Sequence, residues 1–375
     1  MSDDLGLWQH ADGVEPDHRF GYCTDDVARA IVVDMLHSRE GTSAELDVSL
    51  RRSLRFVGDA FDSTSGRFRN LRRADGRWSE EGASEDCHAR ALVGLAAVMA
   101  EMPGTELGDR ASNLFMMALP AAASFGAMRA VSASLLACGS AIDSGKSVGA
   151  EPAFELLAST LARTFDSPEL EPTLGAFRPE TRRFAGLVDR SGDHNNLAAS
   201  LEWPWPEPVL TYENALMPRA LIAAGLRLGR PALLAQGCAV LDWLIEVQAG
   251  ESGQFSPIGN TRWWVRTGER SRFDQQPIEA GVMVSAAADA FRATGRRHYL
   301  DAAEAAYGWF LGGNDVGVAL ADPVRGACSD GLTPRGPSAN QGAESMLMWL
   351  TALEQMRELR RSTEIEPASR IGSDV

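Results

Sequence analysis

The sequence has little positive charge and no long apolar run. Its 375 residues include 36 Lys and Arg against 51 Asp and Glu, which gives a formal net charge of −15. An acidic surface repels phosphate backbones and anionic lipids, so we expect neither nucleic acid nor a membrane surface as a partner. No stretch of about 18 apolar residues occurs, which argues against a membrane-spanning helix.

Cysteines are few, and their spacing does not suggest disulfide bonds. There are five, an odd number, and none forms a C-x-x-C pair. This usage is typical of reduced thiols in the cytoplasm, where we expect the protein to reside. Cys23 and Cys87 lie among acidic residues, which raise the pKa of a thiol, so we expect both to be inert. The acidic N-terminus has no apolar segment typical of a secretion signal.

Several sequence motifs of cofactor and metal sites are also missing. The glycine-rich patterns G-x-G-x-x-G and G-x-x-x-x-G-K-[ST] do not occur, nor does the nucleophile motif G-x-S-x-G. The six histidines show neither H-x-H nor H-x-x-x-H spacing. We therefore expect no nucleotide cofactor, no serine triad and no bound metal.

A similar motif, or phrase, recurs along the chain: one polar residue, then one or two acids, then a run rich in Ala and Leu. Ser, Thr and Asn are favourable N-cap residues, so each phrase predicts the start of a helix. Small residues throughout these segments predict helices that are buried on most sides. The six segments begin TDDVARA at Thr24, SEDCHARA at Ser84, SFGAMRA at Ser124, TYENALMPRA at Thr211, QPIEAGV at Gln276 and NQGAES at Asn340.

Five further segments, between the six, show a one-sided apolar pattern typical of helices with a solvent face. They are residues 45–60, 107–122, 151–165, 231–248 and 298–312. Alternation of six inner with five outer helices predicts an all-α (α/α)6 toroid over residues 1–361, followed by a polar, disordered tail at 362–375. A complete ring needs a twelfth helix, so one outer helix before residue 24 is missing. A homo-oligomer or another partner could cover that seam.

Acidic residues stand at the predicted starts of the inner helices, except at the third, SFGAMRA. In a toroid these starts converge on one rim, so the acids become neighbours and raise one another's pKa. A protonated acid beside an ionised one is what cleavage of a glycosidic bond requires. An acid in the first turn of a helix can equally serve as a cap. The candidate catalytic residues are Asp26, Asp86, Glu213 and Glu279.

The loops before the inner helices are rich in aromatic and polar residues suited to sugars. Aromatic faces stack on pyranose rings, and amide, carboxylate and imidazole groups bond hydroxyls. Each Trp could instead anchor its loop, and His88 could simply be a hydrogen-bonded core histidine. The candidate sugar-binding residues are His10, His18, Asp25, Glu85, His88, His194, Asn195, Trp203, Trp205, Asn260, Trp263, Trp264, Asp274, Gln275, Gln276, Asp330, Asn340 and Glu344.

Three groups of motifs, WQHADG with HRFGYCTDDVARA, FSPIGNTRWW with FDQQPIEA, and CSDGL with NQGAES, resemble a bacterial family of six-hairpin glycosidase-like proteins. The resemblance spans about residues 7–355. Members of that family often occur as the C-terminal part of chains described as glycosyltransferases. The wider superfamily includes hydrolases, phosphorolytic enzymes, lyases and sugar epimerases, so the resemblance implies carbohydrate chemistry without a reaction type.

The preferred interpretation is a glycoside hydrolase that acts on an oligosaccharide with inversion. Asp26 or Glu213 would be the general acid, and Glu279 or Asp86 would activate water. Asp25 and Glu85 would orient sugar hydroxyls or cap their helices, with Arg29 and Arg90 as ion partners behind them.

Three alternatives stay open. An inverting phosphorylase would bind phosphate through Arg262, Arg266 or Arg335. A sugar epimerase would use His18, His88 or His194 as proton shuttles. A non-catalytic carbohydrate-binding or scaffold domain would partner a glycosyltransferase.

Overall fold

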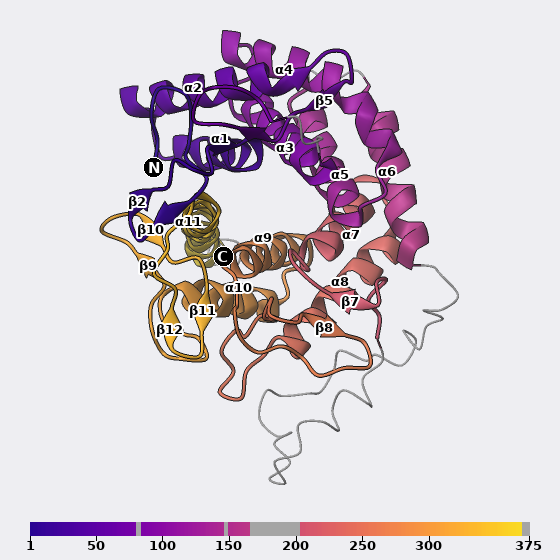
Figure 1. The fold of residues 1–375 in the computed structure, drawn as a ribbon. Coiled ribbons are helices and arrows are strands. Elements are labelled where there is room, and N and C mark those ends of the chain that lie inside the picture. Colours follow the sequence, from indigo (N-terminus) through magenta and orange to yellow (C-terminus); the bar gives the residue numbers. More distant parts are fainter. Residues whose placement is uncertain (80–83, 146–148, 166–202, 370–375) are drawn as a thin grey trace.

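Two concentric rings of helices make up the molecule (Figure 1). The structure is a computed structural model that describes residues 1–79, 84–145, 149–165 and 203–369, with side chains up to residue 363. The inner helices are α1 (Thr24–Ser38), α3 (Glu85–Glu101), α5 (Met128–Asp143), α7 (Leu216–Arg227), α9 (Pro277–Thr294) and α11 (Ala343–Ser369). The outer helices are α2 (Ala44–Ala60), α4 (Glu106–Ala118), α6 (Ala150–Phe165), α8 (Pro231–Val247) and α10 (Arg297–Phe310), and a 3₁₀ helix, η1 (Leu119–Ser124), follows α4.

The inner ring is closed. Each inner helix packs on the next one in the sequence, and α11 packs on α1, which completes the circle (Figure 1). The predicted (α/α)6 toroid with six inner and five outer helices is confirmed. Among the described residues, no outer helix lies between α11 and α1, as the sequence predicted.

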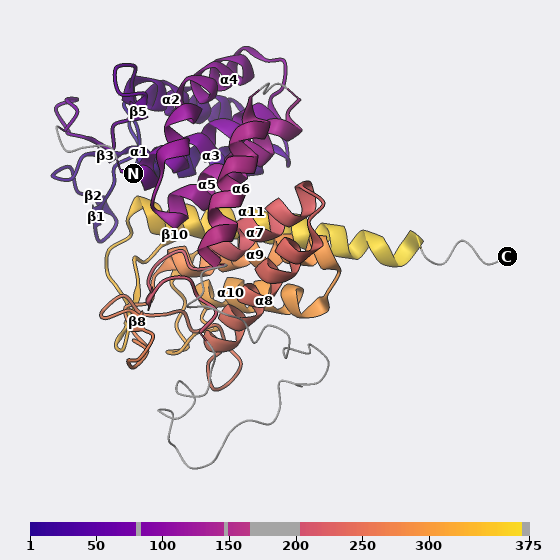
Figure 2. The ribbon, with the colours of Figure 1, turned by 90° about the vertical axis from the view of Figure 1, so that its right-hand side faces the viewer.

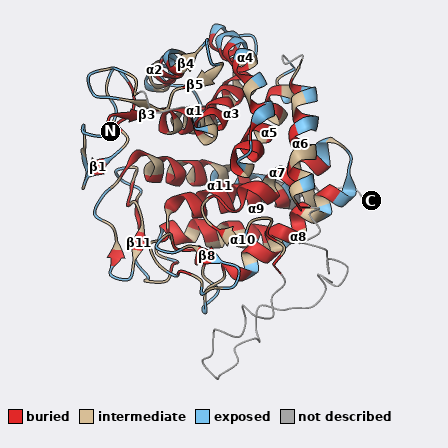
Figure 3. Cartoon of the chain, turned by 45° about the vertical axis from the view of Figure 1, so that its right-hand side comes forward, coloured by how far each residue is buried: buried red, intermediate tan, exposed pale blue. Residues whose placement is uncertain are grey.

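Small residues let the inner helices approach one another closely. A Cβ placed on Gly94 of α3 would lie 3.0 Å from the carbonyl oxygen of Ala28 on α1, and one on Gly281 of α9 would lie 3.1 Å from the carbonyl oxygen of Met348 on α11. Figure 3 shows the result, because the inner helices are buried along most of their length while the outer helices keep an exposed face. The inner ring is therefore the core of the protein.

The connecting loops carry pairs of two-residue strands, which the sequence analysis did not predict. Figure 2 shows that these loops gather at one end of the toroid, while the C-terminal part of α11 projects from the other end. The N-terminal ends of the inner helices lie at the loop end, which we call the rim. The pairs are β1 (Ala11–Asp12) with β2 (Glu15–Pro16), β3 (Tyr22–Cys23) with β6 (Leu71–Arg72), β4 (Phe61–Asp62) with β5 (Arg67–Phe68), β7 (Val209–Leu210) with β8 (Trp264–Val265), β9 (Ala321–Asp322) with β10 (Ala327–Cys328), and β11 (Leu332–Thr333) with β12 (Gly336–Pro337).

Three inner helices begin later than the sequence predicted. α5 begins at Met128 because Ser124 ends the preceding 3₁₀ helix, and α7 begins at Leu216 because Thr211–Asn214 form a separate turn. The α11 helix begins at Ala343, since the side chain of Asn340 instead accepts a hydrogen bond from the amide of Gly13 at 3.3 Å. Of the six predicted caps, only Ser84 accepts a hydrogen bond from a first-turn amide.

The predicted disordered tail is wrong for residues 362–369. The helix α11 continues to Ser369 and so includes these residues. None of the helices in the described part of the chain is long and apolar enough to span a membrane.

Candidate functional site

An arginine of α1 links the first and the last inner helices at the rim. Arg29 Nη1 donates to Asp26 Oδ1 on the same helix at 2.8 Å, and its Nη2 donates to Glu344 Oε2 on α11 at 2.7 Å. Asp26 and Arg29 are almost fully buried, whereas 41% of the Glu344 side chain is exposed. One cation therefore serves two carboxylates.

A second arginine, on α3, binds the turn that precedes α7. Arg90 Nη2 donates to Glu213 Oε2 at 2.5 Å, and both side chains are about nine-tenths buried. The backbone amide of Glu213 in turn donates to Glu279 Oε1 on α9. The side-chain amide of Asn214 donates to Glu279 Oε2 at 3.0 Å.

The fourth candidate acid joins the same turn. Tyr212 Oη donates to Asp86 Oδ2 on α3 at 2.5 Å. Tyr212 directly precedes Glu213, so Asp86 and Glu279 both bind the short segment that contains Glu213. The structure thus brings the predicted catalytic acids of α3, α9 and this turn together, with Asp26 on the neighbouring α1.

Burial changes the proton affinity of two of these acids. It raises the pKa of Asp26 to about 7, with a further rise from Glu344 that opposes the effect of Arg29. It also raises the pKa of Glu279 to about 7, although the amides of Glu213 and Asn214 favour the charged form. Both groups therefore change protonation close to neutral pH.

Two carboxylate oxygens at the rim are shielded from solvent without a hydrogen-bond partner in the described part of the chain. They are Oδ1 of Asp25 and Oδ1 of Asp86. Asp25 Oδ2 accepts only a long bond of 3.5 Å from the amide of Asn70. Buried acceptors of this kind need a donor, which a bound water or a ligand hydroxyl can supply.

The four candidate tryptophans differ in burial. Trp203, Trp205 and Trp264 are buried in the core, and Trp203 packs edge-on against both Trp243 and Trp264. Trp203 Nε1 donates to the carbonyl oxygen of Glu207, and Trp264 Nε1 donates to that of Gly268, so both rings anchor their loops. Trp263 differs, because it is only partly buried and has a left-handed backbone with φ of 56°.

Glu85 and His88 are also better explained by structure than by sugar binding. Glu85 Oε2 accepts hydrogen bonds from the amides of Gly126 and Ala127, which fixes the entry to α5. His88 is fully buried and its two ring nitrogens bond the backbone of Phe68 and Ala118. Burial lowers the pKa of His88 to about 4, so it is neutral at pH 7.

Several predicted binding residues in the loops before α9 and α11 hold those loops in place. Gln275 is buried and bonds Asp315 and Trp309. Asp330 Oδ1 accepts from the amide of Gly342 at 2.6 Å, and Asp274 Oδ2 accepts from Thr261 at 2.6 Å. Other candidates in these loops are partly or fully exposed: Asn260, Gln276 and Asn340.

The histidines of the N-terminal loop are exposed. His18 stacks on Trp8 with ring centroids 4.0 Å apart, and His10 contacts Phe20 edge-on. Arg262, Arg266 and Arg335, the predicted phosphate ligands, are exposed. His194 and Asn195 lie outside the described residues.

Three residues of the rim network were not predicted: Arg129, Tyr212 and Asn214. The signal for Arg129 was present, because SFGAMRA repeats the arginine of TDDVARA and SEDCHARA while it lacks their acids. The roles foreseen for Arg29 and Arg90 need correction as well. Each is an ion partner of an acid, but the partners are Asp26, Glu344 and Glu213 rather than Asp25 and Glu85.

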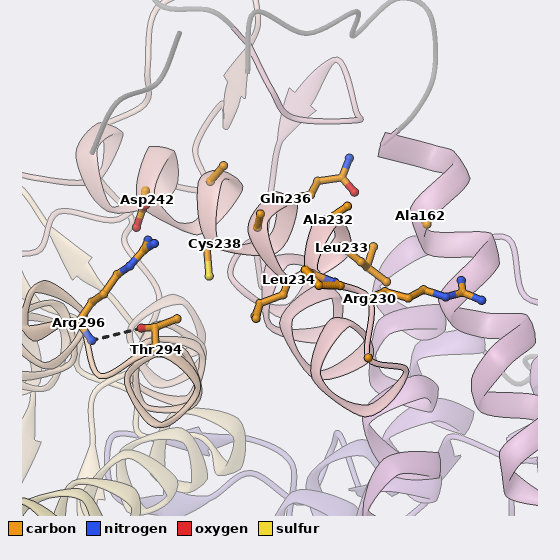
Figure 4. Close-up of a pocket in the computed structure, with 14 residues that line it drawn as sticks. Ala162, Arg230, Ala232, Leu233, Leu234, Gln236, Cys238, Asp242, Thr294 and Arg296 are labelled. Atoms are coloured by element: carbon orange, nitrogen blue, oxygen red, sulfur yellow. Dashed lines mark hydrogen bonds between the residues drawn. The ribbon is translucent and has the colours of Figure 1, made fainter. Parts of the chain in front are cut away.

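A hollow of about 1040 Å³ lies away from the rim, at the C-terminal ends of α7 and α9 (Figure 4). It is lined mainly by the N-terminal part of α8 and by Thr294 and Arg296, and it contains no residue of the predicted site. In the described part of the chain, no group of three or more His, Cys, Asp or Glu side chains is arranged to hold a metal ion.

Comparison with known proteins establishes the fold but no closer relationship. No protein-family model matches this sequence, and no curated protein does. The chain is similar in structure to a sugar epimerase from a ruminal bacterium, with a TM-score of 0.68 and 12% identity over 100% of this chain and 94% of that one. It shares the six-hairpin toroid.

Two other solved structures have the same architecture. Cellobiose 2-epimerase from Spirochaeta thermophila aligns with a TM-score of 0.66 and 15% identity, covering 96% of this chain and 91% of the epimerase. An α-mannanase of Bacteroides thetaiotaomicron aligns with a TM-score of 0.58 and 11% identity, covering 90% of this chain and 88% of the mannanase. Both hydrolases and epimerases are thus built on this toroid.

Proposed function

We propose that this protein is a carbohydrate-processing enzyme, and specifically a glycoside hydrolase that acts on an oligosaccharide at the rim. The observation that carries the proposal is the arrangement of the acids: Asp86, Glu213 and Glu279 meet at the turn before α7, and Asp26 lies on the neighbouring α1. The pKa values of Asp26 and Glu279 are raised to about 7.

The chemistry needs one acid with a proton and one carboxylate without. The protonated acid gives its proton to the glycosidic oxygen as the bond from that oxygen to the anomeric carbon breaks. The carboxylate accepts a proton from the water that attacks the anomeric carbon. A raised pKa at Asp26 or Glu279 and an arginine beside Glu213 are environments that favour opposite protonation states.

A sugar epimerase is the second candidate, because two of the structural neighbours above are described as epimerases. Such an enzyme would remove a proton from a sugar carbon and return it to the other face. Of the histidines predicted as proton shuttles, His18 is exposed on a rim loop, whereas His88 is buried and hydrogen-bonded on both nitrogens. His194 lies outside the described residues.

One experiment separates the two. The protein is incubated in D₂O with a panel of oligosaccharides, and the products are followed by NMR. A hydrolase forms new reducing ends, and the first anomer formed reveals inversion or retention. An epimerase forms no reducing end and places deuterium on a sugar carbon. Sugar binding without either product would contradict both and support a binding domain.

The residues are tested with Asp26→Asn, Asp86→Asn, Glu213→Gln and Glu279→Gln. We expect the general acid and base variants to lose about 100-fold or more in kcat while ligand binding persists. Asp47→Asn on α2, an exposed acid paired with Arg51, is the matched control and should keep wild-type turnover. Full activity in all four rim variants would refute the proposal.

A further inference from the structure

The turn Thr211–Asn214 is held by side chains from three inner helices. Its sequence, TYEN, was predicted to open α7, yet the helix begins only at Leu216. Glu213 has a left-handed backbone with φ of 49°, which is rare for a residue with a Cβ. Such a conformation persists only where the surroundings enforce it, and it occurs most often at functional sites.

Arg129 of α5 fastens the first part of the turn. Its Nε donates to the carbonyl oxygen of Tyr212 at 2.5 Å, and its Nη2 donates to Thr211 Oγ1 at 2.8 Å. The guanidinium lies 4.7 Å from the centre of the Tyr212 ring, and Nη1 bonds both oxygens of Glu207. The Arg129 side chain is only 8% exposed, so these contacts fill its hydrogen-bonding capacity.

Glu279 of α9 fastens the second part. Its two carboxylate oxygens accept hydrogen bonds from the amides of Glu213 and Asn214 and from the side chain of Asn214. Both oxygens of Glu279 are thus engaged inside the protein. A carboxylate in this position is poorly placed to meet a substrate and well placed to shape the turn.

Contacts of the turn fix the carboxylates of Glu213 and Asp86, and one oxygen of each lacks a hydrogen-bond partner among the described residues. Glu213 bonds Arg90 through Oε2, and no residue in the described ranges bonds its Oε1. Asp86 is oriented by Tyr212 through Oδ2, and its Oδ1 has no partner there. The turn therefore sets the positions of both groups at once.

We infer that Arg129 and Glu279 are positioning residues, which hold the TYEN turn so that Glu213 and Asp86 face the sugar. The inference rests on the proposed function and narrows it, because Glu279 leaves the set of candidate acids and bases. It follows from the bonding of the turn and needs no assumption about which sugar binds.

The test combines hydrogen exchange with kinetics. Exchange of the Glu213 and Asn214 amides is measured residue by residue in the wild type, Glu279→Ala, Glu279→Gln and Arg129→Lys. In Glu279→Ala we expect both amides to exchange at least about tenfold faster, because both lose their acceptor. In Glu279→Gln the amide oxygen can still accept from Glu213, so protection should be lost mainly at Asn214.

Turnover should follow the same pattern. Misplacing the reacting carboxylates by about 1 Å costs on the order of 100-fold in kcat, so Glu279→Ala should fall that far with KM within about threefold. Lysine cannot reproduce the several bonds of Arg129, so Arg129→Lys should also lose kcat and speed exchange in the turn. It preserves the charge, which makes it the milder test if Glu279→Ala fails to fold.

Arg227→Lys is the matched control. Arg227 bonds Asp143 at the opposite end of the inner ring, so neither exchange in the turn nor kcat should change. Unchanged exchange in Glu279→Ala, or faster exchange with full kcat, would overturn the inference. If no glycan is turned over, the proposed function fails, while the exchange result still decides whether Glu279 holds the turn.

Discussion

At the rim, arginines from the first half of the chain pair with glutamates from the second half. The first half supplies arginines, one each from α1, α3 and α5: Arg29, Arg90 and Arg129. The second half supplies the glutamates that pair with them: Glu344, Glu213 and Glu207. Residues far apart in the sequence therefore neutralise one another, and the rim is complete only when both halves are folded together.

The burial of these ion pairs determines what happens when one partner is removed. All three arginine side chains are buried, and in the pair Arg90–Glu213 the acid is buried as well. Such a pair stabilises little by itself, but removal of one partner leaves the other buried and charged. At the opposite end of the toroid, pairs such as Arg39 with Glu101 are more exposed. The predictions below test this difference.

Removing one rim arginine should have the largest effect. In Arg90→Met, Glu213 keeps its charge without its partner, and we expect the free energy of unfolding to fall by about 3–5 kcal/mol. Urea denaturation measures this. Adding Glu213→Gln should recover part of the loss, because the second half then no longer brings an unpaired charge. A loss below about 1 kcal/mol would show that the two halves are not coupled here.

The raised pKa values of Asp26 and Glu279 predict a pH dependence. Each folded group binds a proton up to about pH 7, whereas the unfolded groups lose it near pH 4. The folded state thus holds more protons in that window, and stability falls as pH rises from about 4 to about 7, by up to about 3 kcal/mol for each group.

The readout is the difference between the wild type and the double variant Asp26→Asn with Glu279→Gln. Other groups titrate as well, and His88 contributes in the opposite direction because its pKa is lowered. The difference between the two unfolding free energies should therefore change across the window, and a constant difference would contradict the assignment.

A smaller effect is expected at Glu344. Its side chain is 41% exposed, so Glu344→Gln should cost only about 1 kcal/mol. Because Glu344 raises the pKa of Asp26, the substitution should lower that pKa. A titration of Asp26 followed by ¹³C NMR measures it, and an unchanged or higher pKa would show that Glu344 does not raise the pKa of Asp26.

The smallest effect belongs to the exposed end of the toroid. Arg39 bonds Glu101 and Glu358 there, and its side chain is 39% exposed. Arg39→Ala should change the unfolding free energy by less than about 1 kcal/mol, and added salt should reduce the change further. A cost equal to that of Arg90→Met would remove the distinction between rim and far end.

The sequence predicted the helices well because their signals are local. Alanine-rich and one-sided patterns identified eleven helices and their alternation, and the missing outer helix followed from the count. Side-chain roles were harder, because they depend on partners distant in the sequence. Nothing in the local sequence distinguishes the buried Trp203 from the partly buried Trp263. The role of Arg129 depends on a turn that begins 82 residues later in the sequence.

Ring closure has a consequence for how the chain folds. Arg29 and Glu344 are separated by 315 positions, and the amide of Ala343 bonds the carbonyl of Gln9 across a similar span. Contacts of such long range require nearly the whole chain before they can form, which slows folding. A nascent chain that has emerged only through α9 would hold Arg29 without Glu344, so the last hairpin closes the circle as the final step of assembly.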